Sequence, residues 1–413
     1  MPLIAGAESP IPFTTSSGEC LDPYGSGLAI GREVHPTVAA NVLFLHNSSN
    51  WIRGSENALL TLLRGVDREK INPFLLTGNC ELAALAEANG IETLVHLMPE
   101  IMVDGAYVKL QFALWARTVE TIVSWIKQRN VSLVYCNGGS TCQVGYYAAK
   151  KCGIPVICHV HSPYNRRYIL LYRLHLASKV IFVSKAIEKS IREKQSFKAE
   201  CEVVYNGVDV DRFQPSQARD RSWREKLSLP QDAIVFGQVS SLIHRKGIDI
   251  LLRAFQLVTR QYPNSRLVLV GDGPQRADYV SLAKHLGVAD LVSWTGNQAD
   301  PLPFYQQVFD VNVLASRSDA FPLSVLEAAA CALPNIGAMV DGIPESVLNE
   351  QTGLLFEPGN PGSLAEKMLA LVAAPAWRKS LGEAGRRLIV ERFSIERYCR
   401  SIEQVVWNKL SDG

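Results

Sequence analysis

The residue pair with the clearest chemical potential is Asp319 and Glu327, which stand eight positions apart in the sequence. An apolar strand is expected at 311–314, and a helix is expected to begin between the two carboxylates. The first N–H groups of a helix have no carbonyl partner, so they can bind a phosphate group. Two carboxylates beside such a site suit neutral hydroxyl groups, such as those of a sugar and a ribose. The alternative interpretation is an acidic helix cap followed by a glutamate on the helix face.

Two successive runs of alternating strands and helices surround this pair. Strands are expected at 41–45, 74–77, 93–96, 133–136, 156–160, 180–183 and 202–205 in the first run, and at 233–237, 266–270, 291–294, 311–314 and 335–337 in the second. Helical patterns lie between them, for example over 108–129, where apolar residues recur on one face. Apolar strands separated by helices predict a parallel sheet covered on both faces. The predicted fold class is therefore α/β, with two Rossmann-like, doubly wound domains.

A polar stretch that begins near residue 210 separates the two runs and sets the domain boundaries. We expect a poorly ordered segment over 1–40, a first domain over 41–209 and a second domain over 210–393. A final helix is expected over 394–413 and could pack back on the first domain. Ligands of open α/β sheets bind beyond the carboxyl ends of the strands. The functional residues should therefore lie on loops that follow strands and face a central cleft between the domains.

The composition of the 413-residue chain excludes several other classes. The sequence has 42 Lys and Arg against 40 Asp and Glu, a balance that disfavours a nucleic-acid partner. No apolar run reaches the roughly 18 residues of a membrane span, and residues 1–18 lack the pattern of a secretory signal. The nine cysteines match no zinc-binding spacing, so packing explains them, with metal or redox use as the alternative. These features predict a cytoplasmic protein.

The segment from Asp319 to Glu327 resembles the signature of the family 4 retaining glycosyltransferases, in which two glutamates are separated by seven residues. Five further segments match common stretches of that family: Gly54-Ser55-Glu56, Asn206-Gly207-Val208-Asp209, Lys246-Gly247, Gly271-Asp272-Gly273-Pro274 and Gly342-Ile343-Pro344-Glu345. The resemblance covers residues 41–410 and is strongest in the second domain. It implies the GT-B fold of the glycosyl transferases group 1, with the acceptor bound by the first domain and a nucleotide-sugar donor by the second.

The resemblance also implies roles for residues of the second domain. Asp319 would bind hydroxyls of the transferred sugar, and Glu327 would bind the ribose. Lys246 would neutralise the leaving diphosphate, with Arg245 beside it. Gln298 would meet the base through its main chain. The donor diphosphate would be held by the loop residues Phe321, Pro322, Leu323 and Ser324.

In the first domain the resemblance implies contacts to the donor from two places. Gly54 and Ser55 would let the backbone approach a phosphate or the sugar. His161 follows the strand expected at 156–160, and it shares one side with His159 because side chains alternate along a strand. Similar family members carry a histidine here that contacts the donor sugar, and His161 lies nearer the loop. The alternative interpretation is a packed, hydrogen-bonded histidine at the strand end.

Three features depart from the family pattern. Asp319 is one methylene shorter than the usual glutamate, which leaves the choice of donor sugar open. Ser240-Ser241 stands where the family usually has an arginine before its lysine, and Arg245 could replace that cation. Pro322 and Ala332 stand where many members have glycine. Pro322 has no N–H to donate to a phosphate, so the following N–H groups would have to do so.

The resulting hypothesis is a glycosyltransferase that moves a sugar from a UDP- or GDP-sugar to an acceptor hydroxyl with retention, forming an α-glycosidic bond. The acceptor could be lipid-linked, a saccharide or a small molecule. Neither a metal nor a cofactor beyond the nucleotide-sugar co-substrate is expected, since a lysine and a helix end supply positive charge. A nucleotide-sugar epimerase and a non-catalytic nucleotide-sugar-binding protein stay open as alternatives. A nicotinamide enzyme is disfavoured because Gly271-Asp272-Gly273 lacks the third glycine.

One stretch of the first domain is strongly basic. Residues 166–198 contain nine Lys or Arg and two Glu, with Tyr168 and Tyr172 between them. A solvated helix face is one interpretation of this stretch. The other is a surface for anionic lipid or a phosphate-bearing acceptor, which would place the protein peripherally at the inner face of a membrane.

Overall fold

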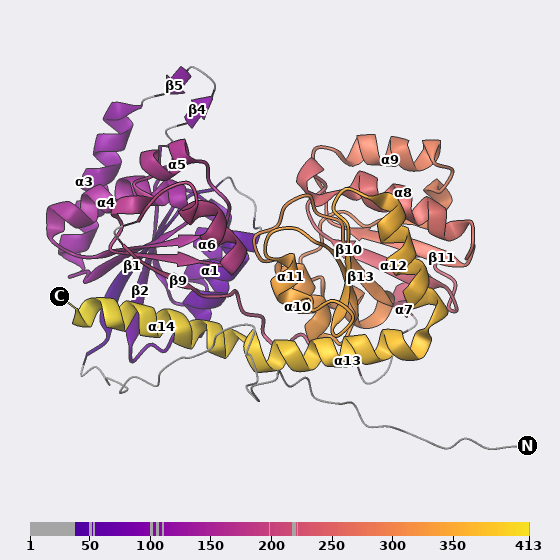
Figure 1. The fold of residues 1–413 in the computed structure, drawn as a ribbon. Coiled ribbons are helices and arrows are strands. Elements are labelled where there is room, and N and C mark those ends of the chain that lie inside the picture. The colour runs from indigo at the N-terminus through magenta and orange to yellow at the C-terminus, as the bar shows by residue number, and fades with distance from the viewer. Residues whose placement is uncertain are drawn as a thin grey trace, which may run out of the picture. The chain divides into compact units, whose positions relative to one another are not determined.

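The computed structural model describes residues 38–48, 52, 54–99, 102–104, 107–109, 111–197, 199–216, 220 and 222–412. The N-terminal segment predicted over 1–40 lies outside these residues, apart from its last three. Two parallel sheets flanked by helices make up most of the described chain (Figure 1). This arrangement confirms the predicted α/β fold class with two Rossmann-like domains.

The first domain contains a seven-stranded sheet in the order β3-β2-β1-β6-β7-β8-β9, in which all neighbouring strands are parallel. Its strands are β1 (Ala40–His46), β2 (Ile71–Thr77), β3 (Glu92–Val95), β6 (Leu133–Asn137), β7 (Val156–Val160), β8 (Lys179–Phe182) and β9 (Glu200–Val203). Its helices are α1 (Gly54–Gly65), α2 (Cys80–Glu87), α3 (Phe112–Gln128), α4 (Gly139–Cys152), α5 (Arg166–Leu171) and α6 (Lys185–Arg192). Residues 42–45 of β1 are all fully buried, as expected for a strand covered on both faces.

The second domain contains a six-stranded parallel sheet in the order β12-β11-β10-β13-β14-β15. Its strands are β10 (Ile234–Val239), β11 (Ser265–Val270), β12 (Val292–Trp294), β13 (Val311–Leu314), β14 (Asn335–Ala338) and β15 (Gly353–Phe356). Its helices are α7 (Ser222–Lys226), α8 (Ile248–Thr259), α9 (Arg276–His285), α10 (Leu323–Ala330), α11 (Ile343–Ser346), α12 (Pro361–Ala373) and α13 (Pro375–Arg392), and the chain continues into α14 (Ile395–Ser411).

The strand order of each sheet reverses once, and each reversal creates a place for a ligand. In the first sheet, β1 lies between β2 and β6; in the second, β10 lies between β11 and β13. Ligands of open α/β sheets bind at the carboxyl ends of the strands on either side of such a reversal. The structure places His46 and Asn137, the last residues of β1 and β6, at the first reversal. The loops after Val239 and Leu314 lie at the second.

The helix predicted over 108–129 begins four residues later than expected. The residues before it form an antiparallel pair, β4 (Met102–Asp104) with β5 (Tyr107–Lys109), in which Val103 stands opposite Val108. Residues 107–109 therefore take part in strand pairing, and the helix starts only after that pairing has ended, at Phe112.

The last strand of the first sheet also differs from the expected one, since β9 begins two residues before the strand predicted over 202–205. Lys179 of β8 stands opposite Glu200 in the backbone pairing of the two strands. Its Nζ lies 3.4 Å from a carboxylate oxygen of Glu200 and 2.9 Å from one of Glu202. These ion pairs stabilise a register that begins at Glu200, ahead of the apolar run on which the prediction was based.

The chain passes between the two sheets twice, and the two passing segments are hydrogen-bonded to each other. Val208 donates its N–H to the carbonyl of Phe393 and accepts from the N–H of Ile395, at 2.9 Å in both cases. A Cβ on Gly207 would lie 2.7 Å from the carbonyl oxygen of Ser394. This close approach explains the glycine in the family segment that the sequence places at the domain boundary.

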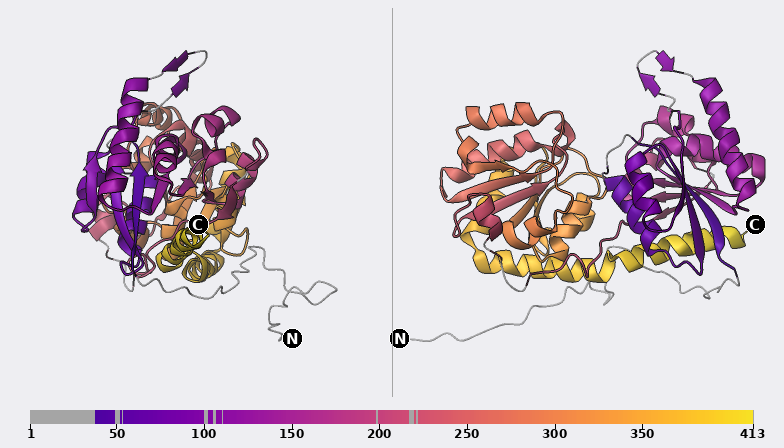
Figure 2. Two further views of the ribbon diagram at one scale, coloured as in Figure 1. Left: turned by 90° about the vertical axis from the view of Figure 1, so that its left-hand side faces the viewer. Right: turned by 180° about the vertical axis from the view of Figure 1, so that it is seen from behind.

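The final helix, α14, lies on the first domain. Glu403 accepts a 2.8 Å hydrogen bond from the N–H of Asp67, which follows α1. Tyr398, Ile402 and Val405 belong to a buried cluster with apolar residues of β1 and α1. Figure 2 shows α14 running alongside the first sheet. The helix thereby supplies part of the first domain's core.

Candidate functional site

The loop between β13 and α10 carries the predicted diphosphate-binding residues. Pro322 stands at the N-cap of α10 with φ −78° and ψ 119°, and the helix begins at Leu323. The N–H groups of Leu323 and Ser324 therefore lie in the first turn, where a helix has no carbonyl partner to offer. Phe321 is buried, and its ring centroid lies 5.0 Å from that of Tyr205. The Phe321 side chain thus anchors the loop, and the donors for an anion are the backbone groups that follow it.

Asp319, Lys246 and Arg245 lie together in the structure. Lys246 Nζ donates to Oδ2 of Asp319 at 2.5 Å, and Arg245 Nη1 lies 3.7 Å from the same oxygen. Asp319 is 7% exposed, whereas 49% of the Arg245 side chain is exposed. The predicted catalytic residues of this domain therefore form a nearly buried ion pair, with a second, more exposed cation at its edge.

Asp341 supports the loop of Asp319. Its Oδ2 accepts hydrogen bonds from the Asp319 N–H at 3.0 Å and from Ser318 Oγ at 2.5 Å. The N–H of Gly342 donates to the carbonyl of Asp319 at 3.1 Å. A Cβ on Gly342 would lie 1.9 Å from the carbonyl oxygen of Ala320, so this close approach requires glycine. The family segment that begins with Gly342 therefore holds the loop of Asp319 in place.

The turn that carries Lys246 is held by Gln238 and Gly247. Gln238 lies in β10, is 1% exposed and donates to the carbonyl of Lys246 at 3.0 Å. Gly247 has a φ of +66°, and a Cβ there would lie 1.9 Å from the carbonyl oxygen of Ala315. Ala315 directly follows β13, the neighbour of β10 in the sheet. Two adjacent strands thus place Lys246 beside Asp319.

Replacing Gly247 by alanine is expected to destabilise the protein by at least about 2 kcal/mol, because the new methyl group adds a backbone clash to the strain of a left-handed φ. Gly287 is a matched control, since its φ is +70° but a Cβ there would meet no heavy atom within 4 Å. Gly287→Ala is expected to cost about 1 kcal/mol, the strain alone. Thermal unfolding measures both, and equal losses would contradict the close approach at Gly247.

Glu327 lies in α10 and contacts Tyr305. The Tyr305 hydroxyl donates to Oε2 of Glu327 at 2.9 Å, and Tyr305 itself is 1% exposed. Burial raises the pKa of Glu327 to about 7, although the hydrogen bond from Tyr305 lowers it in part. Arg212 and Asp300 form a 2.8 Å ion pair nearby and act on Glu327 with opposite signs. The side chain expected to bind a ribose therefore titrates near neutral pH.

Gln298 lies on the loop after β12, and its side chain is exposed. Its Nε2 donates to the carbonyl of Thr295 at 2.9 Å, so the amide is used within its own loop. Gln298→Ala is accordingly expected to leave the affinity for UDP or GDP within about twofold, as for most surface substitutions. Calorimetric titration tests this, and a loss of tenfold or more would assign the base contact to the side chain instead of the backbone.

His161 belongs to a hydrogen-bonded group in the first domain. Its Nε2 lies 2.8 Å from Oδ1 of Asn137, and Nδ2 of Asn137 lies 3.0 Å from Nδ1 of His46. His46 Nε2 in turn lies 3.0 Å from Oε1 of Glu56 in α1. Burial lowers the pKa of His161 to about 3, with a smaller contribution from His46. The imidazole of His161 is therefore neutral at neutral pH.

Gly54 and Ser55 begin α1 beside this group. The Ser55 carbonyl accepts from Asn137 Nδ2 at 3.2 Å, and Ser55 Oγ donates to Oε2 of Glu56 at 3.0 Å. A Cβ on Gly54 would meet no heavy atom within 4 Å. Packing against the described residues therefore does not require a glycine at position 54.

The predicted site residues thus fall into two groups, one on each sheet, and sequence reasoning missed members of both. His46 and Asn137 end the two strands that flank the first reversal, so the predicted strand ends together with the sheet order would have indicated them. No feature of the sequence indicated Tyr305 or Asp341 as members of the site. Tyr305 reaches Glu327 from a short helical segment, Phe304–Val308, and Asp341 reaches Asp319 from the loop after β14, 22 residues away in sequence in both cases.

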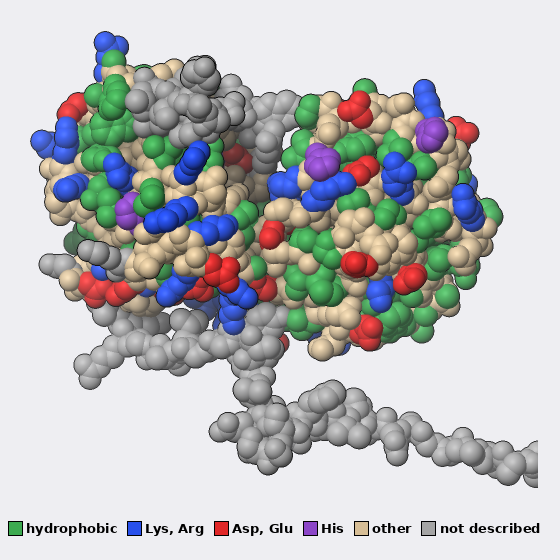
Figure 3. Space-filling view, turned by 45° about the horizontal axis from the view of Figure 1, so that its top comes forward, with side chains coloured by type: hydrophobic (Ala, Val, Ile, Leu, Met, Phe, Trp, Pro, Cys, Tyr) green, Lys and Arg blue, Asp and Glu red, His purple; other side chains and the backbone are tan. Residues whose placement is uncertain are grey.

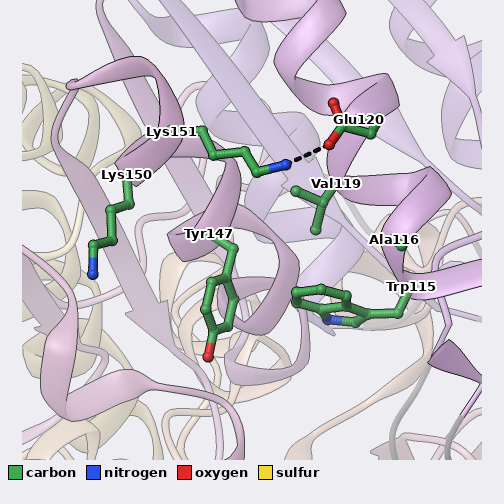
Figure 4. Close-up of a pocket in the computed structure, with 7 residues that line it drawn as sticks. All are labelled: Trp115, Ala116, Val119, Glu120, Tyr147, Lys150 and Lys151. Carbon is green, nitrogen blue, oxygen red and sulfur yellow. Dashed lines mark hydrogen bonds and ion pairs between the residues drawn. The ribbon is translucent and has the colours of Figure 1, made fainter.

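A cavity of about 430 Å³ lies elsewhere, between α3 and α4. It is lined by Trp115, Ala116, Val119, Glu120, Tyr147, Lys150 and Lys151 (Figure 4). The rings of Trp115 and Tyr147 meet edge to face, with their centroids 5.0 Å apart. None of the predicted site residues lines this cavity, so it is separate from both groups described above.

The described residues contain neither a metal site nor a membrane-spanning helix. No three or more His, Cys, Asp or Glu side chains in these residues are arranged to hold a metal ion. The described helices include none with both the length and the apolar character that crossing a membrane requires.

Sequence models of two glycosyltransferase families match the chain. The model described as Glycosyltransferase Family 4 matches residues 52–212, and the model described as Glycosyl transferases group 1 matches residues 219–388. The two matches follow each other without overlap and correspond to the two sheets. The chain therefore belongs to the family 4, group 1 glycosyltransferases, as its sequence motifs predicted.

Curated relatives share part of the sequence. Over 225 residues the chain is 31% identical to the GDP-mannose-dependent alpha-(1-6)-phosphatidylinositol monomannoside mannosyltransferase of Mycolicibacterium smegmatis, covering 52% of this chain and 59% of the relative. Over 245 residues it is 26% identical to the N-acetyl-alpha-D-glucosaminyl L-malate synthase of Bacillus anthracis, covering 59% of this chain and 63% of the relative. The matched region thus spans about three fifths of the length of these relatives.

Solved structures share the fold over nearly the whole described chain. HepE (Alr3699) of Anabaena in complex with UDP-glucose matches with a TM-score of 0.77 at 22% identity, over 89% of this chain and 99% of that one. A glycosyltransferase of Rickettsia africae matches with a TM-score of 0.79 at 20% identity, over 91% of this chain and 100% of that one. These matches confirm the predicted GT-B fold.

Proposed function

We propose that the protein is a retaining glycosyltransferase that transfers a sugar from a UDP- or GDP-sugar to a hydroxyl group, forming an α-glycosidic bond. The observation that carries the proposal is the Lys246–Asp319 ion pair beside the start of α10, the helix that also bears Glu327. The helix N–H groups and Lys246 suit a diphosphate, and the carboxylates suit sugar and ribose hydroxyls. The names of the relatives support this donor class, since one includes GDP-mannose and one structure holds UDP-glucose.

The charges of the second domain suggest how the transfer would be catalysed. Negative charge grows on the diphosphate as the bond between it and C1 of the sugar breaks. The Lys246 ammonium and the N–H groups of Leu323 and Ser324 would stabilise that charge. The acceptor oxygen would bond to C1 on the same face of the sugar, while its proton passes to the leaving phosphate oxygen. This route needs neither a covalent nucleophile on the protein nor a metal ion.

Donor binding provides the first test of this proposal. The protein is heated with UDP, GDP, ADP and their common sugar conjugates in the presence of a metal chelator. A ligand at about 100 times its Kd stabilises the folded state by about 2.7 kcal/mol. For a domain of about 150–250 residues, this corresponds to a rise in Tm of roughly 5–10 °C. A shift with one nucleotide class identifies the base. The absence of a shift with every nucleotide would contradict the proposed donor site.

Turnover then separates the transferase from the two alternatives. With a nucleotide sugar and no acceptor, an epimerase would convert its substrate, whereas a transferase would give only slow hydrolysis. With a panel of lipid-linked, saccharide and small-molecule acceptors, the transferase is expected to form an α-linked product, identified by the anomeric coupling in its NMR spectrum. A protein that binds the donor but neither transfers nor hydrolyses it would be the non-catalytic alternative.

We further propose that the basic stretch 166–198 contacts an anionic membrane surface that carries the acceptor. Arg166, Arg167 and Lys189 are exposed there, and so are Leu170 and Leu176, a combination that suits a lipid interface. Figure 3 shows Lys and Arg side chains gathered on this half of the molecule, next to hydrophobic ones.

Sedimentation with lipid vesicles tests this contact. The protein is expected to bind vesicles that contain phosphatidylserine but not pure phosphatidylcholine, and a double charge reversal, Arg166→Glu with Arg167→Glu, should weaken that binding. Equal binding to both kinds of vesicle would contradict an electrostatic membrane contact.

A further inference from the structure

Four side chains, three from a helix and two strands and one from a loop of the first domain, form one continuous hydrogen-bonded chain. It runs from Glu56 in α1 through His46 at the end of β1 and Asn137 at the end of β6 to His161, just after β7. Glu56, His46 and Asn137 are each 3% exposed. Buried polar groups are costly unless each is hydrogen-bonded, so a complete chain of this kind holds its members in a single arrangement.

The chemistry of the partners fixes which way the Asn137 amide points. Its Nδ2 lies 3.2 Å from the carbonyl oxygen of Ser55, which can only accept a hydrogen bond. The NH₂ group must therefore face Ser55, and Oδ1 must face His161. Because an amide oxygen accepts only, the proton of the neutral His161 ring is on Nε2, 2.8 Å away.

Glu56 and His46 hold the Asn137 amide on the side away from His161 in the hydrogen-bonded chain. The pKa of Glu56 is about 2, because hydrogen bonding and the charge of His46 outweigh the burial that raises it. The ionised carboxylate accepts a hydrogen bond from Nε2–H of His46, 3.0 Å away. The other ring nitrogen of His46, Nδ1, lies 3.0 Å from Nδ2 and 3.1 Å from the backbone carbonyl oxygen of Asn137, so His46 contacts both the side chain and the backbone of that residue.

The remaining nitrogen of His161 is left for a ligand. Within the described residues, Nδ1 of His161 makes no hydrogen bond. The atom is also not fully buried. The ring lies against His159, with their centroids 4.2 Å apart, so it is held on one face as well as at Nε2. Its pKa of about 3 keeps it neutral.

We propose that Glu56, His46 and Asn137 are positioning residues that hold His161 as the Nε2–H tautomer and present its Nδ1 as a hydrogen-bond acceptor to a hydroxyl of the donor sugar. This proposal rests on the proposed function, since it assumes a sugar donor. It assigns His161 to sugar recognition and excludes it as a general acid, because a neutral ring that accepts through Nδ1 has no proton to give there.

The tautomer can be measured without any ligand or activity. In protein labelled with ¹⁵N-histidine, the two ring nitrogens of the Nε2–H form have widely separated shifts, and His161→Gln identifies the signals of residue 161. The wild-type protein is expected to show Nε2–H at pH 7–8. Asn137→Ala is expected to give a mixture of tautomers, and Glu56→Gln a smaller change. A wild-type Nδ1–H signal, or an unchanged tautomer in Asn137→Ala, would overturn the proposal.

A comparison of two ligands tests the link to the sugar. Asn137→Ala and Glu56→Gln are expected to weaken binding of the nucleotide sugar by about tenfold, the value of one hydrogen bond, and to leave the nucleoside diphosphate within about twofold. Thr118→Val is the control, because it removes another histidine contact of the same domain, the 3.1 Å hydrogen bond to His96. It should change neither affinity. Equal losses for both ligands would show general damage and overturn the proposal.

The two measurements also separate this proposal from the proposed function. If the wild-type protein shows the expected tautomer but binds no nucleotide sugar, the proposed function fails and the positioning of His161 stands. If it binds and transfers a sugar but Asn137→Ala is indistinguishable from wild type in both measurements, the positioning role fails and the proposed function stands.

Discussion

Replacing Lys246 by alanine is expected to lower the rate of glycosyl transfer by about two to three orders of magnitude, while the affinity for the nucleoside falls much less. The ammonium stabilises charge that develops on the diphosphate as the donor bond breaks, and losing one such preorganised donor typically costs this much in rate. Lys246 lies 2.5 Å from Asp319 and is held by Gln238 and Gly247, so its position is fixed before the donor arrives. Single-turnover kinetics with saturating donor measure the effect.

Arg245→Ala is the matched control for Lys246→Ala. Arg245 is the neighbouring cation, but it lies 3.7 Å from Asp319 and is half exposed, so its removal is expected to cost about tenfold or less. A larger loss for Arg245 than for Lys246 would reverse the assignment and make Arg245 the replacement for the family's missing arginine. Without Lys246, Asp319 would be a nearly buried charge without its ion-pair partner, which could destabilise the fold. Thermal unfolding of both variants therefore shows whether a loss of rate comes from misfolding.

The second large effect is expected at Glu327. Glu327→Gln should weaken binding of UDP or GDP by about ten- to a hundredfold, because hydrogen bonds from two ribose hydroxyls to a carboxylate are stronger than those to an amide. The pKa of about 7 adds a pH dependence. Nucleotide affinity of the wild-type protein should be full above this pKa and fall as the pH drops below it, whereas Glu327→Gln should show no such dependence. Calorimetric titration between pH 5.5 and 8.5 decides this.

The same pKa predicts that Glu327→Gln is more stable than the wild type at high pH. A carboxyl group whose pKa is raised on folding, here from 4.5 to about 7, destabilises the folded state above pH 4.5, and the penalty is complete above pH 7. The variant is therefore expected to gain up to about 3 kcal/mol at pH 8 and nothing at pH 4. Tyr305→Phe, which removes the hydrogen bond, should move the pH profile of nucleotide affinity upwards. A downward movement would contradict the assigned contact.

The sequence allowed the second-domain site to be predicted more fully than the first. Asp319 and Glu327 lie on one loop and its helix, so their spacing in sequence is also their spacing in the structure. The surroundings that set their properties were not predictable in this way. Tyr305 sets part of the pKa of Glu327, and Asp341 orients the backbone of Asp319, but both come from other segments of the chain and meet the site only through the order of the strands.

The first-domain group shows the same limit more strongly. His161 was predicted from its place after a strand, but its partners His46 and Asn137 come from strands 91 residues apart in sequence, brought together by the parallel pairing of β1 with β6. Periodicity predicts that a segment is a strand, and it does not tell which strand lies beside it. The start of β9 was predicted two residues too late for a related reason, because its pairing with β8 begins at Glu200 opposite Lys179.

The packing of α14 on the first domain has a consequence for how the chain folds during its synthesis. Val42, Phe44 and Leu59 share their buried cluster with Tyr398 and other residues of α14, so the first domain leaves the ribosome with part of its apolar core uncovered. At roughly 5–20 residues per second, the ribosome needs about 10–40 seconds to make the second domain before α14 emerges. During that interval the nascent first domain would be a natural substrate for chaperones, and a messenger truncated before the last helix would yield a protein prone to aggregation.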